Sequence, residues 1–247
     1  MFPNNKSIMK YEIPYEQLSI IGLQPHVVDA MPDEVRSKLE NGEMTPIINV
    51  KRDINGNIVK MPVKLRMEQG VSGDQELVVY PLNAEMKNSM NLSHVSFQKL
   101  EQGEVIHVNG QYLQRDPETN CILKVKDRDL DLEKRLAEIE KVKDIELGIE
   151  QKNLIKEGKP VELNVGGEKV SVGLDLRDRD HFKTLNGDMN EWNRQKQIEY
   201  DIAHPEFVGL VQTERNRWEY QQIKKEGLNS QSIKESPAQS RSSSMRL

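Results

Sequence analysis

The side chains best suited to metal binding or nucleophilic chemistry in this sequence are one cysteine and five histidines. Cys121 alone cannot form an internal disulfide or a cysteine-rich zinc site, so we expect a small, half-buried residue. No two histidines stand at metal-ligand spacing on one helix face; they are His26, His94, His107, His181 and His204. The GxSxG, HExxH and CxxC motifs are absent from the sequence. The sequence therefore predicts no catalytic residue, no metal site and no cofactor.

Two stretches look like ligand-binding loops at first sight. Residues 164–172 (NVGGEKVSV) place a lysine and a serine after two glycines, but they lack the GxxxxGK[ST] spacing of a phosphate loop. Residues 127–138 place acids at positions 1, 3, 5 and 12, as EF-hand calcium loops do, but Leu132 stands where that loop requires glycine. We expect a hairpin turn in the first stretch. The second should be an amphipathic helix with an apolar stripe of Leu132, Leu136, Ile139 and Val142.

Polar and aromatic clusters towards the C-terminus suggest two further kinds of site. Residues 177–181 (RDRDH) are the densest polar group, and their alternating charge favours a solvated loop over a site. Four aromatic residues lie close in sequence to basic ones and could stack on nucleic-acid bases. Because aromatics are only 5% of the chain, we expect these four to form the core of the C-terminal part instead. They are Trp192, Tyr200, Trp218 and Tyr220, with Arg215 and Arg217 nearby.

The composition favours several small modules in an acidic chain. The 247 residues are 36% apolar and 30% charged, which leaves a lean core for this length. The formal net charge of −5 argues against sequence-independent binding of DNA or RNA, which depends on clustered lysine and arginine. No apolar run approaches signal-peptide length or the ~20 residues of a membrane span. We therefore expect a soluble, cytoplasmic protein with no membrane partner.

Three stretches share one pattern around a glycine: KLENGEMTPIINV, KLEQGEVIHVNG and LIKEGKPVELNVGG, with Gly42, Gly103 and Gly158 in register. A short helix precedes each glycine, which ends it in the left-handed conformation that costs other residues a Cβ clash. An apolar strand and an Asn-Gly or Gly-Gly pair follow, and a return strand completes a hairpin. The pattern predicts three helix–Gly–β-hairpin units, whose turn glycines are Gly56, Gly110 and Gly167.

The predicted fold class is α+β, with these repeated small units followed by a separate C-terminal helix and hairpin. Asp188 and Glu191 begin that helix with a near capping box. The Ser-rich end of the chain has almost no apolar residues, so we expect it to be disordered. The predicted parts are the first unit (1–84), the second unit (85–130), a linker helix with the third unit (131–187), the C-terminal helix and hairpin (188–226) and the tail (227–247).

The return strands of the first and third units are the expected docking edges. NIVKMPVKLRM and EKVSVGLDL are long enough to present a row of unpaired amides to a partner strand. The alternation in VKLRM and VSVGLDL is typical of a strand covered on one face only. In the third unit the candidate edge comprises Lys169, Val170, Ser171 and Val172, and proline at Val170 or Val172 should weaken a complex there while the protein stays folded.

Several blocks of the chain carry a family resemblance: YLQRDPETNCILKV, KNLIKEGKPVELNVGGEKVSVGLDL, NGDMNEW and GLVQTERNRWEY. They resemble an uncharacterised bacterial domain family of conjugative transposons and related mobile elements of the Bacteroidetes. IPYEQLSIIGL is similar to the opening of a partner family that often precedes it, and together the two cover roughly residues 10–223. Members are fused to, or encoded beside, topoisomerase-like and other DNA-processing proteins. The resemblance implies a mobile-element setting and supplies no catalytic residues.

Two functions from different classes remain, with an enzyme as a third hypothesis. The first is a non-enzymatic accessory module of a mobile genetic element that docks onto a DNA-processing or transfer protein. The second is direct DNA binding by basic and aromatic residues gathered on one face. An enzyme remains conceivable because dispersed Asp and Glu always permit an acid–base pair in three dimensions. We expect the interaction module.

Overall fold

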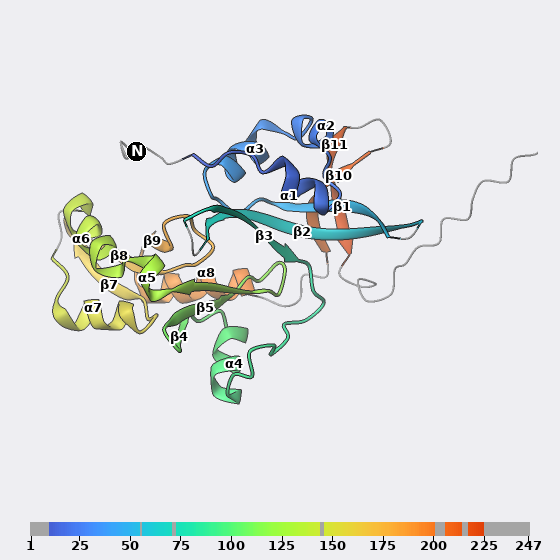
Figure 1. The fold of residues 1–247 in the computed structure, drawn as a ribbon. Helices are drawn as coiled ribbons and strands as arrows, with labels where there is room; N and C mark the ends of the chain where they lie inside the picture. Colours follow the sequence, from blue (N-terminus) through green and yellow to red (C-terminus); the bar gives the residue numbers. More distant parts are fainter. Residues whose placement is uncertain are drawn as a thin grey trace, which may run out of the picture.

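The computed structural model describes residues 10–54, 56–70, 73–143, 146–200, 206–213 and 217–224. Within these ranges, eleven strands form three sheets with helices around them, which confirms the predicted α+β class (Figure 1). The first sheet has the order β11-β10-β1-β2-β3, the second β4-β5-β6 and the third β7-β8-β9. Every pair of neighbouring strands is antiparallel except β1 and β10, which are parallel.

The elements have the following bounds. The helices are α1 (Tyr15–Ile20), α2 (Pro25–Asp29), α3 (Asp33–Glu40), α4 (His94–Glu101), α5 (Asp127–Leu130), α6 (Leu132–Lys143), α7 (Ile149–Lys156) and α8 (Met189–Tyr200). The strands are β1 (Ile47–Ile54), β2 (Asn57–Gln69), β3 (Gln75–Pro81), β4 (Ile106–Val108), β5 (Gln111–Arg115), β6 (Ile122–Lys126), β7 (Val161–Val165), β8 (Glu168–Leu174), β9 (Phe182–Asn186), β10 (Glu206–Gln212) and β11 (Trp218–Lys224).

The predicted helix–Gly–strand joint recurs three times, after α3, α4 and α7. Gly42, Gly103 and Gly158 have φ angles of +68°, +75° and +83°. Each glycine N–H bonds the carbonyl three residues back, and the next N–H bonds the carbonyl five residues back. This double bond pattern is the Schellman motif, which satisfies the last carbonyls of a helix. The residue three before each glycine is fully buried; these are Leu39, Leu100 and Ile155.

Each joint leads into three consecutive antiparallel strands and not into the predicted hairpin alone. The loops between the first two strands contain two residues each in all three units. Asn109 and Gly110 have φ angles of +52° and +72°, and Gly166 and Gly167 have +61° and +88°. Positive φ at both positions is typical of the type I′ turn that matches the strand twist. We call α1–α3 with β1–β3 the first unit, α4 with β4–β6 the second and α7 with β7–β9 the third.

The C-terminal helix and hairpin are present as predicted, but the prediction that they are separate from the units is wrong. β10 pairs with β1 through Ile47–Asn49 and Gly209–Val211, so the hairpin β10–β11 extends the first sheet. The helix α8 lies elsewhere: its Tyr200 hydroxyl donates to the Arg115 carbonyl of the second unit, at 2.7 Å. Local patterns identified both elements, but only long-range pairing decided where they pack.

The return strands β2 and β8 are central strands, so the predicted docking edges are wrong. β2 pairs with β1 on one side and β3 on the other, and β8 pairs with β7 and β9. Val170, Ser171 and Val172 have register partners in both β7 and β9, while Lys169 pairs with Asn164 of β7 and its carbonyl accepts the Gly187 N–H at 2.9 Å. Val170 and Val172 are 8% and 0% exposed, so proline at either position would disrupt the third sheet.

β2 is buried on both faces, in contrast to the one-sided cover that its alternation predicted. Val63, Leu65 and Met67 face the core formed with α1–α3. Lys64 and Arg66, 7% and 4% exposed, point the other way. Figure 1 shows α1–α3 on one side of the first sheet and the second and third sheets on the other. The polar positions of β2 therefore face protein instead of solvent.

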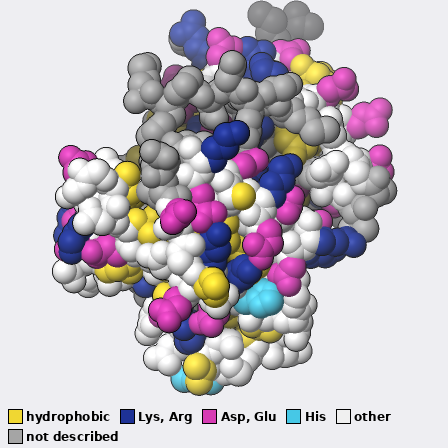
Figure 2. All heavy atoms as spheres, turned by 90° about the vertical axis from the view of Figure 1, so that its left-hand side faces the viewer, with side chains coloured by type: hydrophobic (Ala, Val, Ile, Leu, Met, Phe, Trp, Pro, Cys, Tyr) yellow, Lys and Arg dark blue, Asp and Glu magenta, His cyan; other side chains and the backbone are white. Residues whose placement is uncertain are grey.

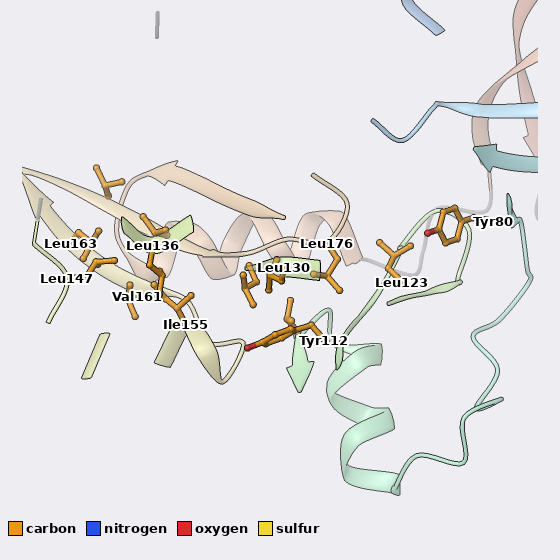
Figure 3. Packing of buried hydrophobic residues seen from close by; sticks show 14 residues of the cluster. Tyr80, Tyr112, Leu123, Leu130, Leu136, Leu147, Ile155, Val161, Leu163 and Leu176 are labelled. Carbon is orange, nitrogen blue, oxygen red and sulfur yellow. The ribbon is translucent and has the colours of Figure 1, made fainter. Parts of the chain in front are cut away.

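The second and third units share one elongated core. Buried side chains run from Leu163 of β7 at one end to Leu123 of β6 and Tyr80 of β3 at the other (Figure 3). α6 contributes Leu136, and Leu132 and Ile139 pack beside it. A continuous core of this kind means that these units depend on each other, whereas the first unit has its own core cluster under α1–α3.

Candidate protein-interaction site

Among the described residues, the cysteine and histidines best suited to chemistry lie apart from one another. Cys121 is half-buried, as predicted, and its Sγ lies 3.2 Å from the Pro81 carbonyl oxygen. Burial raises the pKa of its thiol, which disfavours the reactive thiolate. His107 pairs with Asp127 at 2.7 Å on the surface. Among the described residues, no group of three or more His, Cys, Asp or Glu is placed to hold a metal ion.

The two loop-like stretches adopt the structures that the sequence predicted. Residues 164–172 form the turn and flanking strands of the β7–β8 hairpin. Residues 127–138 are helical except at Asp131, whose φ of +43° separates α5 from α6. The apolar stripe packs on the shared core through Leu132, Leu136 and Ile139. Because helix and calcium loop exclude each other, these acids form no EF-hand site.

The RDRDH group is more ordered than the predicted solvated loop. Arg177 forms ion pairs with Asp175 and with Glu199 of α8, which also binds Lys183 at 2.7 Å. His181 has a φ of +59°, and its Nδ1 lies 3.5 Å from Nη2 of Arg66. Burial, then the nearby guanidinium groups of Arg66 and Arg135, lower the pKa of His181 to about 3. The group thus joins the third unit to α8 and to β2.

Three of the four aromatic residues are at least half-buried, but the four do not form the common C-terminal core that the sequence predicted. Trp192 and Tyr200 are 9% and 7% exposed, and cationic side chains cover their rings. Trp218 is half-buried and its Nε1 donates to the Val27 carbonyl at 3.1 Å. Tyr220 is exposed, at 53%, while Arg215 lies outside the described residues. A base-stacking platform would need several open rings, and these positions offer one.

A groove of about 680 Å³ lies where the joints of the second and third units meet α8. Both joint glycines, Gly103 and Gly158, line this groove. Neither position has room for a side chain, because a Cβ at Gly103 would lie 2.5 Å from the Tyr200 ring and one at Gly158 would lie 2.5 Å from the Val105 carbonyl oxygen. Lys99, Lys196 and Glu104 line the groove as well. Glu157, Asp175 and Glu199 also line it, so the groove carries charges of both signs. Figure 2 shows acidic and basic side chains interspersed on the side of the molecule that lies to the left in Figure 1.

Polar side chains of β2 hold the units together. Lys64 pairs with Asp116 of the β5–β6 loop at 2.9 Å, and with Glu118. Arg66 donates to the Gly42 carbonyl at 3.2 Å and to the Leu176 carbonyl of the third unit at 2.7 Å. Sequence reasoning missed these contacts. A lysine and an arginine at the centre of a long strand were the available signal, since such positions are rarely charged unless paired.

The β3 edge of the first sheet is blocked. The β2–β3 register, with the bond from Leu82 N–H to the Pro62 carbonyl, turns the N–H groups of residues 75, 77 and 79 outward, and position 81 is the next outward position. Gln17 of α1 accepts the Leu77 N–H through Oε1 at 2.7 Å. Pro81 has no N–H to offer. The Gln75 side chain accepts the Glu12 N–H at 3.0 Å, so the N-terminal segment also covers this edge.

At the other end of the same sheet, no strand in the described part of the chain pairs with the outer side of β11, so β11 is an open edge within that part. The bond from the Thr213 N–H to the Arg217 carbonyl continues the β10–β11 ladder, so Trp218, Tyr220, Gln222 and Lys224 direct their backbone groups away from β10. No proline interrupts β11, and Glu219 to Gln222 are all exposed. Sequence reasoning predicted this hairpin but did not identify its outer strand as an edge, because that depends on β10 joining β1.

Every helix in the described part of the chain is too short or too polar to traverse a lipid bilayer.

Comparisons with known proteins cover only part of the chain. No curated protein and no solved structure matches the sequence. Residues 8–91 match the family described as "Protein of unknown function (DUF4099)". The match encloses all of the first unit, from α1 to β3, so this unit is similar to a family of unknown function.

Proposed function

We propose that the protein is a non-enzymatic interaction module that accepts a strand of a partner protein at the open β11 edge. The resemblance of the sequence to mobile-element proteins suggests the partner, a DNA-processing or transfer protein of a bacterial mobile genetic element in the cytoplasm. The observation that carries the proposal is the contrast between the two edges of the first sheet. β3 is blocked by Gln17 and Pro81, whereas no residue that the structure describes pairs with the outward amides of β11.

Strand addition suits the chemistry of this edge. An extended segment that pairs with β11 gains main-chain hydrogen bonds from the outward groups of Trp218, Tyr220 and Gln222. The register places Val208 and Tyr220 on the same face of the hairpin, and they are 61% and 53% exposed. These apolar side chains supply a contact for alternate side chains of the added strand, which is how such sites gain specificity.

Direct DNA binding is less well supported. Of the four aromatic residues considered for stacking, Trp192 and Tyr200 are buried under cations and Trp218 is tied to α2. The groove lining combines basic residues with acids, namely Lys99, Lys156, Lys159, Arg177, Lys183 and Lys196 with Glu104, Glu157, Asp175 and Glu199. A gel-shift series at increasing salt tests this alternative: steep weakening with salt would mean phosphate contacts, and the interaction module should show little binding at any salt.

The proposal is tested by removing one outward amide from β11. Gln222→Pro deletes an N–H that faces away from β10, and proline is tolerated where an edge N–H faces solvent. Gln222→Ala removes the same side chain and keeps the N–H. Each variant is co-expressed with the proteins encoded beside this chain, and the affinity of the complex is measured. We expect Gln222→Pro to weaken it at least about tenfold and Gln222→Ala about twofold or less. Equal affinities would contradict strand addition at β11.

A further inference from the structure

The hairpin β10–β11 is attached to the first unit by a short interface. β10 pairs with β1 only over Ile47–Asn49 and Gly209–Val211, whereas β10 and β11 pair with each other along their whole length. Two side chains anchor the hairpin. Leu210, 1% exposed, joins the core cluster of the first unit, and Trp218 hydrogen-bonds the Val27 carbonyl. The hairpin therefore pairs with itself along its whole length and contacts the first unit over a small area, as a bound peptide would.

The β1 edge has the shape of an acceptor for this hairpin. Gly209 faces Ile47, and a Cβ at position 209 would lie 3.1 Å from both the Ile47 carbonyl oxygen and its Cγ2, and 2.5 Å from Cδ1 of Ile223. The close approach of β10 to β1 therefore needs a residue without a side chain at this point. Beyond the three residues that pair with β10, the β1 edge is closed, because Gly22 packs against the Lys51 carbonyl oxygen.

The family match separates acceptor from hairpin. Residues 8–91 include β1 and the apolar core that receives Leu210, but not residues 206–224. The part of the chain that matches a family thus contains a complete acceptor, and the occupant comes from far along the chain.

We infer that the β1 edge is a strand-acceptor site for a β-hairpin. Residues 206–224 fill it within the same chain, and the same hairpin of a second copy can take their place. Recognition requires glycine opposite Ile47, an aliphatic residue at the position of Leu210 and an aromatic residue at the position of Trp218. This inference concerns β1 and does not rest on partner binding at β11.

The test uses the full chain and a fluorescent peptide of residues 206–224, which represents the hairpin of a second copy. In the wild-type chain the attached hairpin competes at a high effective concentration. The chain variant Gly209→Val should free the β1 edge without altering it, because the added side chain is on the hairpin. We expect the peptide to bind this variant at least tenfold more tightly than the wild type. A peptide carrying the same Gly209→Val change should lose that binding.

A second variant, compared in its oxidised and reduced forms, keeps the test decisive if Gly209→Val does not fold. Asn49 and Val211 are register partners, and neighbouring strands bring Cα atoms to about 4.8 Å, within disulfide range. Asn49→Cys with Val211→Cys, in a Cys121→Ser background, locks the hairpin when oxidised. Peptide binding that appears only in the reduced form supports the inference. No binding to the reduced form, even at peptide concentrations above the about millimolar effective concentration of the attached hairpin, overturns it. Equal binding to both forms also overturns it and places the peptide elsewhere, as at β11, which leaves the proposed function standing.

Discussion

The two faces of β2 are equally buried and chemically opposite. One face carries Val63, Leu65 and Met67 into the core under α1–α3. The other carries Lys64 and Arg66 to the second and third units. Both sets of side chains are less than a tenth exposed. A single strand therefore separates an apolar interior from a polar junction between units.

The difference indicates what each face contributes. Burial of apolar side chains is non-directional and stabilises the first unit at about 25 cal/mol per Å². A buried ion pair gains little net stability, but it is strongly unfavourable when one partner is missing. The charged face therefore admits one arrangement of the units, in which Lys64 meets Asp116 and Arg66 meets the Leu176 carbonyl. In this protein we interpret the charges as determinants of how the units dock.

The largest expected effect comes from breaking the pair on the charged face. Burial alone would raise the pKa of Asp116, but Lys64 and hydrogen bonds from Thr119 outweigh it and lower that pKa. Asp116→Ala leaves the Lys64 ammonium buried with only the exposed Glu118 near it. We expect the free energy of unfolding, measured by urea denaturation, to fall by about 3–5 kcal/mol.

A double variant separates the pair from the packing around it. Lys64→Met with Asp116→Asn removes both charges and keeps an acceptor for the Thr119 N–H and hydroxyl. It should recover at least half of the stability that Asp116→Ala loses. Stability close to wild type in Asp116→Ala would show that the charged face does not hold the units together.

The apolar face should give the next largest effect. Leu65 is 0% exposed at the centre of the first core, and its N–H bonds the Thr45 hydroxyl. Leu65→Ala should cost about 2–5 kcal/mol of unfolding free energy, because it removes buried methyl groups and leaves a cavity. Lys60→Ala, on an exposed position of the same strand, is the matched control and should change stability by about 0.5 kcal/mol or less. Similar losses in both variants would argue against a packed core under α1–α3.

The joints of the fold could be predicted from the sequence because their signals are local. A helix end at Gly103 and a tight turn at Asn109-Gly110 depend on φ angles that only a few residue types adopt. The third strand of each unit was not predicted. The segments before β3 and β9 contain no Asn-Gly or Gly-Gly pair, so neither strand is marked by a turn dipeptide. Without them, β2 and β8 looked like edges.

The candidate site was predictable only in part for the same reason. The pattern EFVGLVQ…WEYQQI identifies a hairpin, but nothing nearby in sequence reports that β10 pairs with β1. Whether a strand is central or at an edge is a property of the assembled sheet. Likewise, the sequence does not predict that the Gln17 side chain blocks β3, because this contact depends on α1 lying beside β3 in the folded protein.

The smallest expected effect concerns pH and the end of the charged face. His181 lies beside Arg66, and its folded pKa of about 3 is below the ~6.5 of an unfolded histidine. The folded protein therefore keeps this imidazole neutral, while the unfolded chain takes up a proton as the pH falls through about 6.5. Stability is full above that pH and declines below it, by no more than about 1.4 kcal/mol per pH unit.

Asparagine is the matched replacement for His181, because it does not titrate and tolerates the positive φ at this position. Urea midpoints measured at pH 7.5, 6.5 and 5.5 should fall more steeply for the wild type than for His181→Asn. The remaining histidines are common to both proteins and cancel in the comparison, and Asp116, with its lowered pKa, stays ionised throughout this range. Parallel pH profiles would mean that His181 is as free to bind protons when folded as when unfolded. The guanidinium groups of Arg66 and Arg135 would then exert no effective repulsion on it, and the charged face of β2 would end before the third unit.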